Sequence, residues 1–218
     1  MKIDKKNLRL ITSGILVVLF VAACSSREDK VAELIKKEMF STLYDYDSYQ
    51  PVETKIDTLR RDKYGDTLIF DNAMLLSVAS DAFDKANESF YEQKEIAEIY
   101  TPSYYSSSYS NNKFSEARKK MRESLGQMQF FVGKIDSLNN EIKKIEKDCD
   151  NKQYGWLVTH KFRCKTKGGN SNLLTSYFFV DDKCKRILRQ FDDEKMSLEL
   201  YKDRIDAALE EEKAEDEK

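Results

Sequence analysis

Apolar positions in the middle of the chain recur every seven residues over two long stretches. The first stretch contains Ile69, Leu76, Phe83, Phe90 and Ala97, and the second contains Phe114, Met121, Met128, Ile135 and Ile142. Such heptads are typical of helices that pack side by side, and about a dozen residues connect the two. We therefore expect an antiparallel, coiled-coil-like helical hairpin over residues 66–149. About 32 residues at 1.5 Å each predict an arm of roughly 48 Å. The alternative is that both helices pack lengthwise on the rest of the protein.

After Asp150 the apolar period changes from seven to two. Strict alternation from Tyr154 to Cys164 predicts a strand, and the turn sequences that follow predict two more strands, at 173–180 and 184–191. Elsewhere we expect one further strand, at 49–59, and two amphipathic helices, at 31–44 and 196–209.

These elements predict an α+β fold. Its small antiparallel sheet consists of a meander plus one strand, with flanking helices and the long inserted hairpin. Because the two ends of a hairpin lie close together, the segments on either side of it can form one base. The expected organisation is a signal peptide at 1–23, a tether at 24–30, an α+β base at 31–64 plus 150–209, the hairpin at 66–149 and a disordered charged tail at 210–218.

The amino-terminal residues have the pattern of an export signal. A positively charged head precedes an apolar run of about 14 residues, which is shorter than the roughly 20 that a membrane-spanning helix needs. The run ends in Val21-Ala22-Ala23-Cys24, which resembles the bacterial lipobox. The resemblance implies a diacylglyceryl thioether on Cys24, cleavage before it, and acylation (palmitate) of its amine. An uncleaved anchor, or a plain signal with a chance cysteine, is the alternative.

The residues after Cys24 bear on the location of the protein. The residue after the cysteine is Ser25 and not an aspartate. By analogy with lipoprotein sorting rules, this favours the outer membrane over the inner one, and it does not decide which leaflet carries the protein. Glu28 and Asp29 resemble the acidic surface-export tags of Bacteroidetes lipoproteins, although Arg27 beside them departs from that pattern.

Composition restricts the partners. Removal of residues 1–23 changes the formal charge from −2 to −5, because four cations and one anion leave. A mildly acidic chain with interspersed charges argues against nucleic acid as a partner. The expected partners are the lipid bilayer, through acylated Cys24, and an envelope protein.

Three cysteines besides Cys24 remain, so at most one pair can form within the chain. Cys164 and Cys184 are expected at opposite ends of the meander, on the order of 20 Å apart, whereas a disulfide needs Cα atoms within about 7 Å. A bond between Cys149 and Cys184 stays open, beside the alternative of three unpaired thiols. No spacing matches a zinc site.

No catalytic, metal or cofactor motif is present in the sequence. His160 is the chain's single histidine, and we interpret it as a structural residue on the aromatic side of its strand. The segment at 101–112 is more suggestive, because Tyr104, Tyr105 and Tyr109 stand there among serines, as in binding loops. It could equally be a solvated linker.

Parts of the base resemble a known group of proteins. Asp47-Ser48-Tyr49-Gln50-Pro51, the segment from Trp156 to Lys165, and Tyr177-Phe178-Phe179-Val180-Asp181 are similar to small Bacteroidetes lipoproteins of no established function. The likeness covers about a third of the chain and excludes the hairpin. It implies an envelope location and an α+β base, and it transfers no active site.

Three functions are compatible with these features. The first is a membrane-anchored, non-catalytic interaction protein of the cell envelope, without a cofactor. The second is a small-ligand binding module that uses the aromatic face between sheet and helices. The third is an envelope hydrolase, which would need His160 in a cleft beside a carboxylate and a nucleophile.

Overall fold

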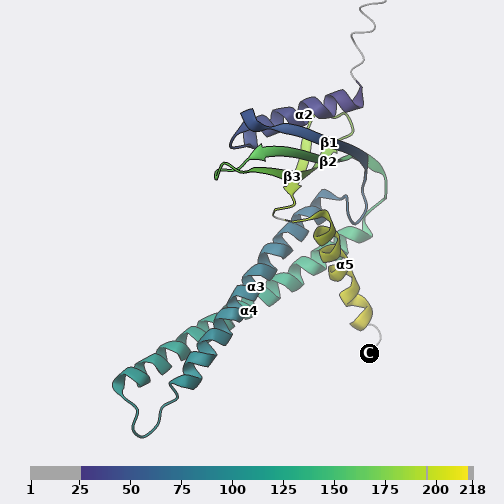
Figure 1. Ribbon diagram of the computed structural model, residues 1–218. Coiled ribbons are helices and arrows are strands. Elements are labelled where there is room, and N and C mark those ends of the chain that lie inside the picture. Colours follow the sequence, from purple (N-terminus) through teal and green to yellow (C-terminus); the bar gives the residue numbers. More distant parts are fainter. Residues whose placement is uncertain (1–25, 195, 216–218) are drawn as a thin grey trace, which may run out of the picture. The chain divides into compact units, whose positions relative to one another are not determined.

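The computed structural model describes residues 26–194 and 196–215, with side chains up to residue 210. The expected signal peptide and Cys24 lie outside the described residues. The fold is α+β, as the sequence predicted, with a four-stranded antiparallel sheet and a long helical hairpin (Figure 1). In chain order the elements are α2 (Arg27–Thr42), the 3-10 turn η1 (Tyr46–Ser48), β1 (Gln50–Arg60), α3 (Thr67–Ile99), α4 (Ser108–Lys147), β2 (Gln153–Lys165), β3 (Ser171–Asp181), β4 (Ile187–Asp192) and α5 (Leu198–Glu215).

The sheet has the order β1-β2-β3-β4, so each strand lies beside the next one in the chain. Between β2 and β3 the register places Trp156 opposite Val180 and Cys164 opposite Asn172. The strand predicted at 184–191 begins later, at Ile187. The reason is the turn that follows β3, in which Cys184 has a φ of 55° and its N–H donates to the carbonyl of Asp181 at 2.9 Å.

The chain divides into two compact units, and the first comprises residues 1–59 and 154–195. In its described part, α2 lies along one face of the sheet (Figure 1). Ser26 caps this helix, because its hydroxyl accepts from the Asp29 N–H and the Asp29 carboxylate accepts from the Ser26 N–H. The helix therefore begins earlier than the expected tether allowed. The core between helix and sheet is apolar and contains Val31, Ile35, Met39, Val158, Phe162, Cys164, Phe178, Val180 and Cys184.

The second unit comprises residues 60–153 and 196–218, and the hairpin forms most of its described part. Helices α3 and α4 have 33 and 40 residues, so they are about 50 and 60 Å long. The heptad positions form their common core, where Ile69 and Ile142 are fully buried. Further along, the Ser124 hydroxyl donates to the Ser89 hydroxyl across the pair at 3.1 Å.

Helix α5 groups with the hairpin, whereas the sequence had placed it in the base. The Tyr201 ring lies 5.5 Å from that of Phe70, and its hydroxyl donates to the carbonyl of Tyr64 at 2.8 Å. The carboxylate of Asp206 accepts from both Lys63 and Tyr64. The helical backbone continues to Glu215, into the segment expected to be a disordered tail.

Candidate functional site

The end of the hairpin carries the most exposed aromatic side chains of the described residues. Tyr104 and Tyr105 lie in the connection between α3 and α4, and they are 95% and 91% exposed. Their rings touch edge to face, with centroids 5.1 Å apart. Two bonds order the loop around them: the Ser103 N–H donates to the Ser106 hydroxyl at 2.6 Å, and the Ser106 N–H donates to the Ser103 carbonyl at 3.1 Å. The two rings therefore project into solvent from a turn.

Tyr109, the third tyrosine singled out by the sequence, lies in the first turn of α4 instead of the loop. The reason is Ser107, whose hydroxyl accepts from the Ser110 N–H and starts the helix there. Tyr109 is 61% exposed, and its ring meets that of Tyr100 at 6.0 Å. The fold thus places all three predicted tyrosines at one end of the hairpin. We call Tyr104, Tyr105 and Tyr109 the tip surface.

A groove of about 320 Å³ lies next to the tip surface, between α3 and α4. Its net charge is only +1, because Glu116 is shared by two lysines and pairs with Lys120 at 3.1 Å and with Lys113 at 3.7 Å. The Lys120 ammonium lowers the pKa of the Glu116 carboxyl. Such a groove suits aromatic and hydrogen-bonding contacts better than a highly charged ligand. Its lining residues are Gln93, Ile96, Tyr100, Tyr109, Lys113, Glu116, Ala117 and Lys120.

His160 is buried in the sheet unit, with 2% of its surface exposed. Its two ring nitrogens are each 2.8 Å from a hydroxyl, Nε2 from that of Tyr49 and Nδ1 from that of Thr54. Burial lowers the pKa of the imidazole. A neutral ring with both nitrogens bound to hydroxyls has the geometry of a satisfied core residue, and it lacks the cleft that the hydrolase hypothesis required.

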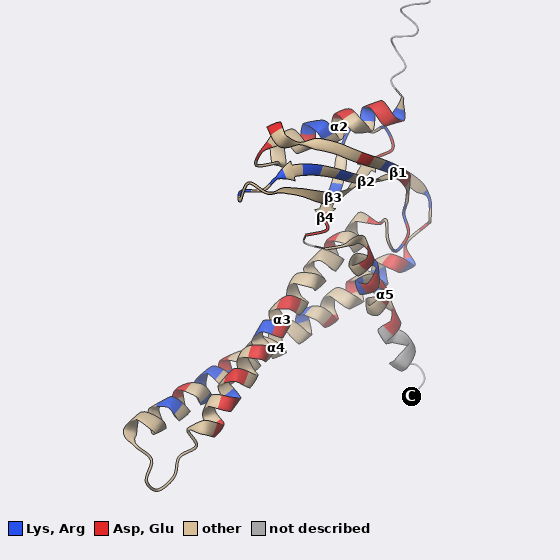
Figure 2. Cartoon of the chain, in the orientation of Figure 1, with Lys and Arg blue, Asp and Glu red and all other residues tan. Residues whose placement is uncertain are grey.

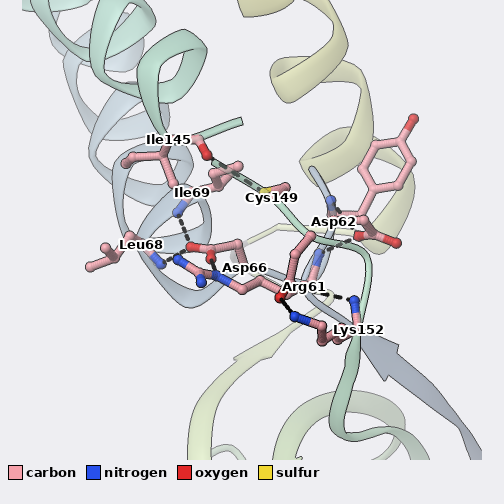
Figure 3. Close-up of polar contacts among 11 residues, drawn as sticks. Arg61, Asp62, Asp66, Leu68, Ile69, Ile145, Cys149 and Lys152 are labelled. Carbon is pink, nitrogen blue, oxygen red and sulfur yellow. Dashed lines mark hydrogen bonds and ion pairs between the residues drawn. The ribbon is translucent and has the colours of Figure 1, made fainter. Parts of the chain in front are cut away.

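The three described cysteines are all free thiols. Cys164 and Cys184 are buried, and burial raises the pKa of both. The thiol of Cys149 lies 3.6 Å from the Ile145 carbonyl, and its pKa is also raised by burial (Figure 3). A raised thiol pKa disfavours the thiolate, which is the nucleophilic form of cysteine.

A polar cluster joins the start of α3 to the loop after α4 (Figure 3). The buried carboxylate of Asp66 accepts from the N–H groups of Leu68 and Ile69, and it pairs with Nε of Arg61 at 3.0 Å. The Arg61 backbone bonds that of Lys152 at 2.9 Å. The sequence analysis missed this N-cap, although an aspartate just before an apolar run is the usual signal for one. Each carboxylate oxygen of Asp66 is occupied, so the cluster serves to fix the helix.

A second hollow, of about 310 Å³, lies in the first unit between α2 and the turn after β3. Its lining is basic, with Lys30 and Lys37 on the helix, Lys183 and Lys185 on the turn, and Glu33 as the acidic member. None of the four lysines pairs with a carboxylate among the described residues. Sequence reasoning missed this site because the two lysine pairs are far apart in the chain.

No known protein family, curated protein or solved structure matches this chain. Within the described ranges there is neither a cluster of residues suited to hold a metal ion nor a helix with the length and apolar character to cross a membrane.

Proposed function

We propose that this chain is a lipid-anchored, non-catalytic interaction protein of the cell envelope, which contacts a partner protein through the tip surface. The observation that carries the proposal is the near-complete exposure of Tyr104 and Tyr105 at the end of a hairpin with helices of 33 and 40 residues. A hairpin of this length holds two aromatic rings some 50 Å from its other end.

The chemistry of the tip surface supports contact with a protein. Tyrosine supplies a large contact area for the loss of few rotatable bonds, and its hydroxyl adapts to polar neighbours. Tyrosine is also among the residues that dominate binding energy at protein interfaces. Tyr104 and Tyr105 do not contribute to a core, so folding alone does not account for two aromatic residues at this position.

The anchor is part of the same proposal. Cys24 in the lipobox-like segment stands three positions before Arg27, the first residue of α2. Diacylglyceryl and amide-linked acyl chains on Cys24 would hold the first unit at a bilayer, since two or more chains anchor durably where one binds only marginally. The proposed location is the outer membrane, because Ser25 and not an aspartate follows Cys24.

The anchor is tested by fractionation. A Cys24→Ala variant is expected to leave the membrane pellet in high salt, or to accumulate with its signal uncleaved, while Cys164→Ala stays lipidated. Mass spectrometry of the wild-type mature chain should find acyl chains on its first residue. An unmodified first residue would disprove the anchor and leave the tip hypothesis standing.

The tip is tested by site-specific photo-crosslinking in cells. A crosslinker at position 105 is expected to give one discrete adduct with another envelope protein. A crosslinker at Glu92, on the shaft of α3, should give no such adduct. With the crosslinker at position 105, Tyr104→Ser should weaken the adduct, because it removes the neighbouring ring of the tip surface while the helices stay intact. The matched control is Tyr91→Ser, which removes an aromatic residue that is 55% exposed on the shaft. Equal adducts from positions 92 and 105, or none from either, would count against the tip.

The basic hollow favours a second candidate, binding of a small anion. Four unpaired ammonium groups around about 310 Å³ attract a carboxylate or phosphate, although exposed lysines bind such groups as point charges only. Titration with inorganic phosphate, followed by amide chemical shifts at α2 and residues 183–185, tests it. Lys183→Gln with Lys185→Gln should remove the shifts, whereas Lys152→Gln, at a lysine remote in sequence, should not.

A further inference from the structure

The outward side of α4 carries two glycines that the chain's own fold does not require. Gly126 and Gly133 are exposed, and a Cβ atom on either one would meet no atom within 4 Å. Neither has a positive φ. A glycine inside a helix costs about 1 kcal/mol relative to alanine. These two positions therefore weaken the helix without any compensating contact inside the described residues.

Phe130 lies between the two glycines and is 67% exposed. The positions 126, 129, 130 and 133 follow the spacing i, i+3, i+4, i+7, which on a helix encloses one hole for a side chain of a facing helix. Because α4 meets α3 on the side of Ser124, whose hydroxyl bonds that of Ser89, this hole on the opposite side faces away from α3. Residues 124–133 contain no charged side chain, and charged residues flank them on both sides (Figure 2).

We propose that two copies of this chain pair through this face of α4 in antiparallel orientation, with Phe130 of each copy seated between Gly126 and Gly133 of the other. The arrangement is self-complementary, because one hole and one aromatic knob lie on the same face, as a two-fold symmetric interface requires. Two glycines at the ends of the hole let the helices approach closely around the ring.

The flanking charges favour a second copy in this orientation. When Phe130 of one copy meets the hole of the other, position 122 lies beside position 137. Arg122 then stands next to Asp136 of the second copy, and on the other side Glu123 stands next to Lys134 of the second copy. Arg122, Asp136 and Lys134 have no ion-pair partner within their own described chain, and Glu123 has only a long contact of 3.9 Å with Lys119. A second copy would provide all of them with opposite charges.

A parallel pair would not have this complementarity. It would place Arg122 against Arg122 and Lys119 against Lys119 of the two copies, directly on the contact face. In the antiparallel pair Lys119 lies beside Glu141 of the second copy, and Lys144 lies opposite Ser115. Like charges that face each other across an interface are destabilising. The antiparallel orientation is therefore the one that the charges select.

Cysteine crosslinking of the full chain in cells tests the contact and its orientation. Two copies of a Gln129→Cys chain have their new thiols side by side at the centre of the face, so oxidation is expected to give a species of twice the mass of the single mature chain. Two Ser115→Cys chains place theirs about 40 Å apart, and they should not link. Co-expressed Ser115→Cys and Lys144→Cys chains should link to each other. The parent chain shows the background from its native thiols.

Each other result overturns the proposal. No dimer from Gln129→Cys excludes this face, and a Ser115→Cys dimer indicates the parallel orientation. A link from position 129 to a different protein means that the face binds a heterologous partner. A face that inserted into a bilayer would give no protein adduct.

Light scattering on the full chain in mild detergent gives an independent readout. Gly126→Gln with Gly133→Gln fills the hole but improves helix propensity, so the chain should become monomeric without a lower melting temperature. Phe130→Gln should weaken association by roughly thirtyfold or more in Kd. Asn111→Gln with Asn112→Gln, at exposed positions near the start of α4, is the matched control and should leave the dimer intact. A monomeric wild-type chain at high concentration, or a dimer unchanged by the glycine variants, would contradict the proposal.

Discussion

The carbonyl oxygen of Val180 occupies the space that a Cβ atom on Gly155 would need. The contact joins β2 to β3 within the sheet, where Gly155 lies opposite Asp181 and next to the pair formed by Trp156 and Val180. Because the obstacle is backbone and not the end of a flexible side chain, it can move only if the two strands separate. The observed pairing of β2 with β3 therefore requires a glycine at position 155.

Gly155→Ala is expected to destabilise the sheet unit by about 3 kcal/mol, the upper end of overpacking costs, because a methyl group must displace the Val180 carbonyl. Urea unfolding followed by the fluorescence of Trp156, the only tryptophan of the chain, measures it. Gly168→Ala is the control, since its Cβ would lie 3.8 Å from the Thr166 hydroxyl, at ordinary contact distance. Equal stability of the two variants would contradict the role assigned to Gly155.

Asp66 combines an N-cap with a charge pair, and the two roles can be separated. Asp66→Ala loses both and leaves Arg61 unpaired, so we expect a loss of about 2 kcal/mol. Asp66→Asn keeps a cap oxygen and should lose less than half of that. Thermal unfolding followed by far-UV circular dichroism, which reports mainly the helices, measures both. Arg61→Gln controls for the pair alone, and a loss as large as that of Asp66→Ala would show that the cap contributes nothing.

The free thiols give a chemical prediction. Since burial raises the pKa of Cys149, Cys164 and Cys184, their alkylation in the folded protein should be slow at neutral pH and faster in alkaline buffer. Cys149 should react first, because it is the least buried of the three. Unfolding without reductant should expose all three thiols. A count of one would reveal a disulfide, and a count of four would show that Cys24 carries no lipid.

The sequence predicted the elements better than their assembly. The heptads of the hairpin and the alternation of β2 are local patterns, and both elements formed where these patterns stood. For α5, the apolar stripe with Tyr201 and Ile205 showed which side of the helix is buried. It did not show which other element this side packs against. It could not reveal that Tyr64 and Asp206 would bind each other, because a sequence pattern says nothing about partners far apart in the chain.

The candidate sites follow the same division. Tyr104 and Tyr105 were found because they are clustered in the sequence, and the tip needs only the hairpin that the heptads predict. The basic hollow was missed because Lys30 and Lys183 come together only in three dimensions. To find the hole around Phe130, one must know which side of α4 faces α3. The heptad positions already indicate that side.

His160 makes the stability of the sheet unit depend on pH. Burial lowers its folded-state pKa below the ordinary 6.5, so between these two values the unfolded chain binds a proton that the folded chain does not. The contribution of His160 to the free energy of unfolding is therefore fully present above about pH 6.5. It decreases as the pH falls below that value, by up to roughly 1.4 kcal/mol per pH unit. Below the lowered folded pKa the loss from this residue stops.

The chain has no other histidine, so the assignment of this pH dependence can be tested with one variant. His160→Leu leaves the hydroxyls of Tyr49 and Thr54 without their partner and should be less stable by about 2 kcal/mol at neutral pH. Its stability should nevertheless stay flat between pH 5 and 7 (roughly the range in which histidine titrates), where that of the wild type falls. Thr54→Val keeps the imidazole and should keep the slope. Urea unfolding of the three proteins at several pH values, read by Trp156 fluorescence, decides it: if the leucine variant loses stability as steeply as the wild type, another group is responsible.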